Sequence, residues 1–138
     1  VLITGANTGI GRAAATELAR RGAAVVLACR SPEKTQPVID DIRARTGNAA
    51  VDFLALDLAD LSSVRRAAQS YLDSGRRLHV LINNAGLAGQ RGSTRDGFEI
   101  AFGTNHLGHF LFTNLLLDRL RSDAPARIVN VASMSHFD

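Results

Sequence analysis

The sequence predicts an α/β domain in which a parallel sheet carries helices on both faces. Short apolar runs alternate with amphipathic stretches along all 138 residues, a pattern typical of parallel strands connected by helices. The first apolar run also leads into a glycine-rich turn and then a helical pattern, VLITGANTGIGRAAATELARRG. We expect one doubly wound domain over residues 1–138, with five strands in the spatial order 3-2-1-4-5.

The composition is that of a globular protein, with 46% hydrophobic and 21% charged residues. The formal net charge is only +3 and the arginines are scattered, so no nucleic-acid partner is expected. Cys29 is the single cysteine, which excludes an internal disulfide and fits a reducing, cytoplasmic compartment. No apolar run is long enough to cross a membrane. The chain begins inside an apolar run without an initiator methionine, which indicates a piece of a longer protein whose membrane anchoring stays open.

The first part of the chain predicts three strands and three helices. In the first helix, Ala14, Leu18 and Ala19 have the spacing of core residues. The expected strands are Val1–Thr4, Ala24–Cys29 and Val51–Leu56, and the expected helices are Gly11–Arg21, Pro32–Arg45 and Leu61–Ser74.

Helix signals fix where the second and third helices start. Ser31 stands where an N-cap is expected, directly before a proline in the first helical position. Pro37 lies inside that helix and is expected to weaken its first turns, since proline lacks the amide donor. Either Asp60 or Ser62 can cap the third helix.

The second part continues the alternation of strand and helix. His79–Ile82 predicts the fourth strand and is followed by Asn83-Asn84-Ala85-Gly86. Asp96–Arg121 predicts mostly helix, in two segments interrupted near Gly103. Arg127–Val131 predicts a fifth strand, which we expect to have an open edge.

Three glycines with the spacing Gly-x-x-x-Gly-x-Gly follow the first strand. The N-terminus of a helix attracts a phosphate through its amides and its dipole, and a turn without side chains lets the phosphate approach. Strand, glycine turn and helix is the context of a dinucleotide-binding, Rossmann-type motif; a plain glycine-rich loop is the alternative. The residues expected to contact the dinucleotide here are Gly5, Asn7, Thr8, Gly9, Ile10 and Gly11.

Arg30 stands directly after the second strand. At this position an acidic residue accepts hydrogen bonds from the ribose hydroxyls of NAD, whereas a guanidinium can pair with the 2′-phosphate of NADP. The sequence therefore favours NADP(H) over NAD, and the alternative is that Arg30 is an ordinary surface residue.

Polar and small residues follow the third and fourth strands, at the sheet edge where a ligand is expected. Asp57 can hold an adenine amino group or can act as a turn residue. The tetrapeptide after the fourth strand offers amides and room for a ligand, although a simple turn would look the same. The contacts predicted at these two places are Asp57, Leu58, Asn83, Ala85 and Gly86.

Further candidates lie in the last helix and after the last strand. Asn105 sits in an apolar helical stretch, where its amide needs hydrogen bonds from the protein, a water or a ligand. His106 and His109 can share a helix face, but no carboxylate or thiol lies at ligand spacing, so no metal site is expected. Ser133 and Ser135 follow the fifth strand, where a hydroxyl can bind a substrate oxygen; a serine-rich turn is the alternative.

Together these motifs resemble the short-chain dehydrogenase/reductase family over the whole chain. Thr4-Gly5-x-x-x-Gly9-x-Gly11 is similar to its cofactor motif, and Asn83-Asn84-Ala85-Gly86 to its next signature. Asn105 in TNHLGHF and Ser133 in RIVNVASMS match its catalytic asparagine and serine, with Ala132 replacing a serine found in many members. The segments ACRS, DGFEIAFGTNHLGHFLFTNLLLDRL and APARIVNVAS resemble the retinol-dehydrogenase branch, which mostly uses NADP(H).

The resemblance implies hydride transfer between the nicotinamide and an alcohol or carbonyl carbon. In the family the serine polarises the substrate oxygen, the asparagine holds the helix geometry and a relay water, and a Tyr-x-x-x-Lys pair moves the proton. The only tyrosine here, Tyr71, is followed four positions later by Gly75, and the only lysine is Lys34, so neither matches that pair. We expect a truncated, inactive cofactor-binding part of a parent enzyme that uses NADP.

Two other functions remain open from the sequence. One is a non-catalytic dinucleotide-binding module that acts as a sensor or interaction domain; the other is a member that uses NAD. The substrate is expected to be a small carbonyl or alcohol compound, lipid-like ones included, and a homo-oligomer is open. The helix around Asn105 is apolar on more than one side, so we expect part of it to be exposed here and covered in the parent by a later helix or a second subunit.

Overall fold

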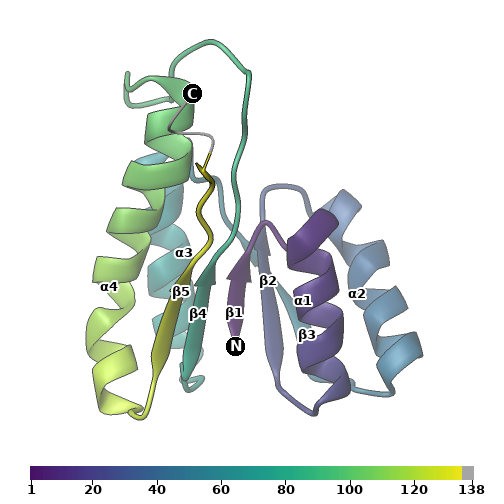
Figure 1. Cartoon of the computed structure of the whole chain (residues 1–138). Coiled ribbons are helices and arrows are strands. Elements are labelled where there is room, and N and C mark those ends of the chain that lie inside the picture. The colour runs from purple at the N-terminus through teal and green to yellow at the C-terminus, as the bar shows by residue number, and fades with distance from the viewer. Residues whose placement is uncertain (135–138) are drawn as a thin grey trace.

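The computed structural model describes residues 1–134, which build a parallel sheet with helices on both faces (Figure 1). The strand order is β3-β2-β1-β4-β5, which confirms the predicted order, and each neighbouring pair is parallel. The strands are β1 Leu2–Thr4, β2 Val25–Cys29, β3 Val51–Ala55, β4 Val80–Asn83 and β5 Arg127–Asn130. The helices are α1 Gly9–Arg20, α2 Pro32–Thr46, α3 Leu61–Asp73, the π-helix η1 Phe102–Leu107 and α4 Gly108–Ser122.

The core consists of two clusters, one on each face of the sheet. Successive side chains of a strand point to opposite faces, so Leu2 packs with residues of α3 and α4 while Ile3 packs with residues of α1 and α2. All five residues of β2 are buried. Near-continuous apolar strands of this kind are what a sheet covered on both faces requires.

Helix α1 buries a slightly different stripe from the one predicted. Gly11, Ala15 and Ala19 are its buried residues, spaced four apart. Ala19 is therefore confirmed as a core residue, whereas Ala14 and Leu18 are only half-buried. The difference arises because Gly11 brings the helix close to the turn after β1, which places the four-residue row on the sheet.

The predicted weakness at Pro37 is not seen, because α2 runs unbroken through it. Pro37 is exposed, so the carbonyl that loses its amide partner can bind water. The buried side chains of Val38, Ile39 and Ile42 hold the helix on the sheet. Ser31 caps this helix as predicted, since its side chain accepts from the amide of Lys34.

The helix predicted over Asp96–Arg121 begins later and is not interrupted. Helical backbone starts at Ile100, widens into the π-helix η1 and continues directly into α4. Gly103 does not end a segment; it is buried where a Cβ would press on Thr94. The Asp96 carboxylate lies outside the helix and accepts from the amide of Leu61.

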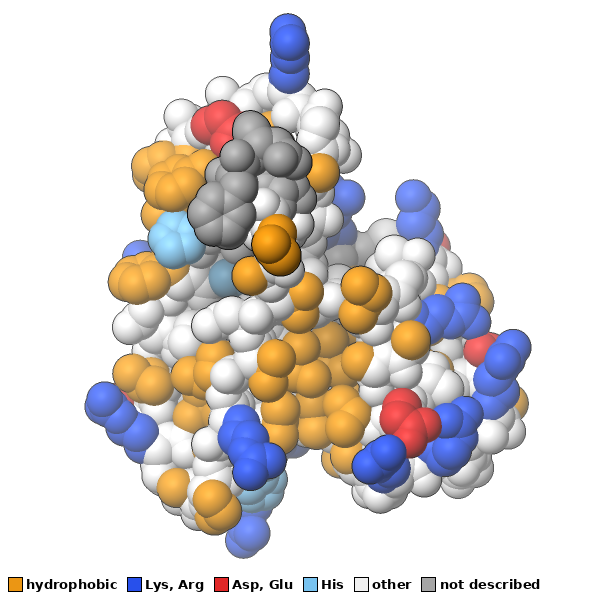
Figure 2. Space-filling model, viewed as in Figure 1, with side chains coloured by type: hydrophobic (Ala, Val, Ile, Leu, Met, Phe, Trp, Pro, Cys, Tyr) orange, Lys and Arg blue, Asp and Glu red, His pale blue; other side chains and the backbone are white. Residues whose placement is uncertain are grey.

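The expected exposure of the last elements is confirmed. Within the described residues β5 pairs with β4 alone, and all four of its residues are exposed. On the helix side, Phe102 and Phe110 are 53% and 61% exposed. Figure 2 shows hydrophobic side chains gathered across the middle of this face of the molecule. No helix in residues 1–134 has the length and apolar character needed to span a membrane.

Candidate functional site

The glycine turn after β1 fits a dinucleotide because two of its glycines are tightly packed and the third is open. Gly5 has φ +62°, and a Cβ there would lie 2.8 Å from the Cα of Ala85. A Cβ on Gly11 would lie 2.6 Å from the carbonyl oxygen of Gly5, so this glycine permits close packing of helix and turn. Gly9 has φ +55° and no atom within 4 Å of a built Cβ, so the backbone between the two packed glycines is open to a ligand.

The N-terminus of α1 offers amide donors that no side-chain cap uses. Thr8 has the extended backbone of an N-cap, φ −154° and ψ 166°, but its side chain makes no cap hydrogen bond. The first amides of a helix have no partner within the helix, and here neither a side-chain cap nor an acidic residue of the first turn engages them. Ile10 is 75% exposed in this turn and Asn7 is half-buried beside it. Such a terminus can bind a pyrophosphate.

Thr4 and Asn84 tie the turn after β4 to the glycine turn. The Thr4 hydroxyl accepts from the amides of Asn84 and Ala85, both at 3.0 Å. The Asn84 amide group donates to the carbonyls of Thr4 and Gly5 at 3.0 and 3.2 Å. Asn84 is thus the amide side chain that shapes the glycine turn, whereas the sequence prediction named Asn83 and not Asn84.

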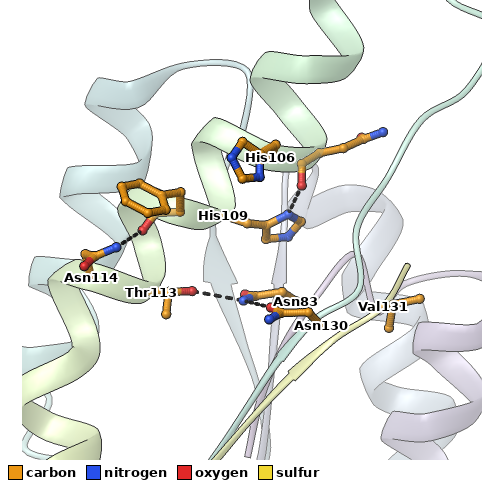
Figure 3. Close-up of a pocket in the computed structure, with 9 residues that line it drawn as sticks. Asn83, His106, His109, Thr113, Asn114, Asn130 and Val131 are labelled. Atoms are coloured by element: carbon orange, nitrogen blue, oxygen red, sulfur yellow. Dashed lines mark hydrogen bonds between the residues drawn. The ribbon is translucent and has the colours of Figure 1, made fainter. Parts of the chain in front are cut away.

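Asn83 points to the other side of β4. Its Nδ2 donates to Thr113 Oγ1 and Asn130 Oδ1, both at 2.9 Å (Figure 3). Together with Asn105 and Val131 it lines a pocket of about 440 Å³ beside η1 and β5. The Asn83 Oδ1 atom is buried without a partner in the described part of the chain. The Asn83 side chain therefore lines this pocket, and the Asn83 carbonyl accepts from the amide of Val131 at 3.0 Å.

Asn105 lies on an exposed part of η1, not in an apolar interior as its neighbours suggested. Its Nδ2 donates to the carbonyl of Leu87 and its Oδ1 accepts from the Leu87 amide, both at 2.9 Å. Gly86 lies against it, with a built Cβ 3.6 Å from Asn105 Oδ1. The side chain has a structural role here, because it fastens the end of the turn after β4.

His106 and His109 both line the pocket beside η1 and β5, in agreement with the predicted common face, but they differ in burial. His109 is 7% exposed, with Nε2 2.8 Å from Thr4 Oγ1 and Nδ1 2.9 Å from the Asn105 carbonyl oxygen. His106 is exposed, and its ring lies between those of Phe102 and Phe110. Burial lowers the pKa of His109, opposed by the Asn105 hydrogen bond and supported by His106. The described residues contain no group of three or more candidate metal ligands.

The remaining predicted contacts follow β2 and β3 at the same edge of the sheet. Arg30 is exposed and forms no ion pair with any residue of 1–134. Asp57 accepts from the amide of Ala59 at 2.9 Å, so its turn role is present. Leu58 is 6% exposed and packs against Gly108, where a built Cβ would lie 2.5 Å from the Leu58 carbonyl oxygen.

Ser133 is exposed and follows the pocket-lining residue Val131 by two positions in the chain. Ser135 lies outside the described residues. Tyr71 is a buried residue of α3 whose hydroxyl donates to the carbonyl of Arg77, and burial raises its pKa. Lys34 is exposed in the first turn of α2. The structure therefore keeps Tyr71 and Lys34 apart from Asn105 and Ser133.

Comparison with known proteins gives the family. The family model described as short chain dehydrogenase matches residues 1–138. The human protein Retinol dehydrogenase 13 is 52% identical over 137 residues, which are 99% of this chain and 41% of that protein. Retinol dehydrogenase 12 of Mus musculus is 53% identical over 138 residues, covering 99% of this chain and 44% of that protein. The chain thus spans less than half the length of these relatives.

Solved structures agree in fold and extent. A crystal structure of an uncharacterised protein from Mycobacterium paratuberculosis has a TM-score of 0.81 and 50% identity, covering 98% of this chain and 46% of that one. An alcohol dehydrogenase from Thermococcus sibiricus, solved in complex with 5-hydroxy-NADP, has a TM-score of 0.76 and 30% identity over 88% of this chain and 53% of that one. The match over the whole chain, the strand order and the glycine turn agree: this protein belongs to the short-chain dehydrogenase family of oxidoreductases.

Proposed function

We propose that residues 1–138 form the cofactor-binding domain of an oxidoreductase that uses NADP(H) to interconvert an alcohol and a carbonyl. The observation that carries this proposal is the open backbone at Gly9 between two crowded glycines, set at the uncapped N-terminus of α1. When bound, the nicotinamide supplies or accepts the hydride. The residues proposed to hold the cofactor are Gly5, Asn7, Thr8, Gly9, Ile10, Gly11, Arg30, Asp57, Leu58, Asn83, Ala85 and Gly86.

The preference for NADP rests on Arg30. Its guanidinium is exposed at the carboxyl end of β2, beside the glycine turn that follows β1. A 2′-phosphate would give it a partner, and Arg and phosphate can form two parallel hydrogen bonds. The Thermococcus sibiricus relative was solved with an NADP derivative, which is consistent with this preference.

The proposed catalytic roles fall to Ser133 and Asn105. Ser133 would polarise the substrate oxygen through a hydrogen bond from its hydroxyl, and Asn105 would hold the turn after β4 against η1. The proton-transferring tyrosine and lysine would come from a segment beyond residue 138, and the 138 residues alone are expected to be inactive. The names of the relatives favour a small, lipid-like alcohol or aldehyde such as a retinoid as substrate.

The test is a titration of the chain with NADP⁺ and NAD⁺, comparing the wild type with Arg30→Asp. We expect NADP⁺ to bind more tightly than NAD⁺, and Arg30→Asp to weaken NADP⁺ at least about tenfold, the scale of a charge-assisted contact, without weakening NAD⁺. Arg77→Asp is the matched control, because Arg77 is an exposed loop arginine before the amino end of β4, opposite the carboxyl edge that carries the glycine turn. Equal effects of both variants, or binding of neither nucleotide, would contradict the proposal.

A further inference from the structure

The hydrogen bonds around Thr4 fix the state of the His109 ring. A hydroxyl has two lone pairs and one proton. The Thr4 oxygen accepts from the amides of Asn84 and Ala85, so its proton is left to donate, and His109 Nε2 lies 2.8 Å away. Nε2 must then be unprotonated, and Nδ1 carries the proton that it donates to the Asn105 carbonyl at 2.9 Å.

Both ends of the turn at residues 84–87 depend on groups that His109 contacts. The start of the turn is held by the Thr4 hydroxyl, whose oxygen accepts hydrogen bonds from the amides of Asn84 and Ala85. The end is held by the Asn105 side chain, which accepts from the Leu87 amide and donates to the Leu87 carbonyl. One imidazole therefore contacts both anchors (Figure 3 shows His109 and its bond to the Asn105 carbonyl).

The π-helix explains why a side chain is needed at this point. In a π-helix the backbone hydrogen bonds reach five residues back, so the turn is wider than in an α-helix. His109 lies four residues after Asn105, and its ring reaches back to the Asn105 carbonyl at the point where η1 changes into α4. This contact orients the Asn105 backbone, and with it the side chain that binds Leu87.

We propose that His109 is a positioning residue: its neutral, Nδ1-protonated ring holds Thr4 and Asn105 in register and so keeps the turn at residues 84–87 in its binding geometry. The consequence for cofactor binding rests on the proposed function. The consequence for the turn itself, and for the state of the ring, does not.

The surroundings of His109 make this state dependent on pH. The groups that face it from β1 and η1, Thr4 and the Asn105 carbonyl, are uncharged, and the titratable neighbour acting on it within residues 1–134 is His106. A second ring proton would face a Thr4 oxygen whose lone pairs are already used. The anchor at Thr4 should therefore weaken as the pH falls through the pKa of His109, which burial holds below the usual histidine value.

The first experiment needs neither a variant nor a cofactor. Nitrogen-15 NMR of the imidazole rings in the wild-type chain at pH 7.5 reports which ring nitrogen is protonated, with His109→Phe used only to assign the signal. We expect Nδ1 protonated and Nε2 bare. An Nε2-protonated or doubly protonated ring would overturn the proposal.

The second experiment measures the turn directly. Hydrogen exchange at the amides of Asn84, Ala85 and Leu87 should be at least about tenfold faster in His109→Phe, the scale of one lost buried hydrogen bond. His106→Gln is the matched control from the same helix and should leave these rates unchanged. If His109→Phe does not fold, Thr4→Val replaces it, and Thr4→Ser, which keeps the hydroxyl, should restore the wild-type rates. Unchanged rates in Thr4→Val or His109→Phe would overturn the proposal.

The third experiment separates this proposal from the proposed function. NADP⁺ affinity is measured from pH 5 to 8 in the wild type, His109→Phe and His106→Gln, and the phosphate's own titration cancels in the ratios. We expect His109→Phe to bind about tenfold more weakly at pH 7.5 and the ratio to move toward one as the pH is lowered, because protonation of His109 removes the anchor in the wild type. A constant ratio near one would overturn the role of His109. Absence of binding in the wild type would instead contradict the proposed function, and the exchange rates would still test the turn.

Discussion

Helices α1 and α3 both start at the carboxyl edge of the sheet, yet their first turns are completed differently. At α3 the Asp60 carboxylate accepts from the amides of Ser62 and Ser63 and from the Ser62 hydroxyl. At α1 the residue in the same position, Thr8, has the extended backbone of a cap but forms no cap hydrogen bond with its side chain. Helix α3 therefore uses its first amides in a cap, whereas the first amides of α1 are left without a side-chain cap.

The difference separates a structural terminus from a binding terminus within one domain. A capped helix uses its free amides internally and gains stability from the cap. The terminus of α1 lacks a cap and the stabilisation that a cap provides. It contains glycines instead, which let the turn and the helix pack closely and leave the backbone at Gly9 uncovered by a side chain. A loss of local stability of this kind is expected at a site where a bound ligand supplies the missing hydrogen bonds.

The largest effect is expected for Gly11→Ala. The new Cβ would meet the Gly5 carbonyl oxygen at 2.6 Å and the Ala6 Cα at 3.0 Å, and both are backbone atoms that cannot turn aside. Relief requires α1 to move away from the glycine turn. We expect NADP⁺ affinity to fall by roughly a hundredfold and the free energy of unfolding by about 1–3 kcal/mol, measured by titration and by urea unfolding.

Gly75→Ala is the matched control for Gly11→Ala. Gly75 has φ +70° and no atom within 4 Å of a built Cβ, at the far end of α3. Its substitution costs backbone strain of about 1 kcal/mol without crowding, and cofactor affinity should stay at the wild-type value. Equal losses of affinity in the two variants would mean that the glycine turn has no special part in binding.

The sequence was sufficient for the architecture because each signal was local. Apolar runs, helix caps and the glycine spacing each depend on a few adjacent residues, and they led to the observed strand order. Errors at the ends of elements were small: β2 begins at Val25, one residue later than predicted. Asp60 rather than Ser62 proved to be the cap of α3, a choice that depends only on which side chain lies before the first turn.

The parts of the site that were missed depend on contacts between distant residues. His109 meets Thr4 across 105 positions of the chain, and no local pattern encodes that pairing. The π-helix was missed as well, because a prediction based on 3.6 residues per turn contains no signal for the wider turn of η1. Asn83 and Asn84 look equivalent in sequence, but adjacent residues at a strand end point to opposite sides.

Thr8→Asp should convert the binding terminus into a structural one. The backbone of Thr8 already has the cap conformation, so an aspartate there can accept from the amides of the first turn. We expect the free energy of unfolding to rise by up to about 1 kcal/mol while NADP⁺ affinity falls about tenfold, because a carboxylate then occupies and repels the phosphate position. Thr8→Ser, which adds no charge, is the control. If Thr8→Asp is more stable but binds NADP⁺ as tightly as the wild type, the phosphate does not bind at the N-terminus of α1.

Asp60→Ala tests the other terminus and should affect stability alone. The substitution removes the acceptor of the Ser62 and Ser63 amides, so the melting temperature should fall by roughly 3–4 °C, as for loss of a cap in a domain of this size. NADP⁺ affinity, measured well below the melting temperature, should not change. A variant that binds the cofactor more weakly while fully folded would show that the two termini are not independent.

Asp60→Asn has the smallest expected effect, because asparagine caps as well as aspartate and only the charge is lost. Hydrogen bonds from the Ser62 hydroxyl and from the amides of Ser63 and Ser62, together with the nearby Arg95, hold the pKa of Asp60 below its usual value. A carboxylate whose pKa is lower in the folded state stabilises that state above the unfolded pKa of about 3.9, and the contribution disappears as pH falls through the folded value. The wild type should therefore melt slightly above Asp60→Asn at pH 7, and the two curves should converge as the pH falls below the folded-state pKa. A gap that persists in acid would show that the stabilisation comes from the shape of the cap and not from its charge.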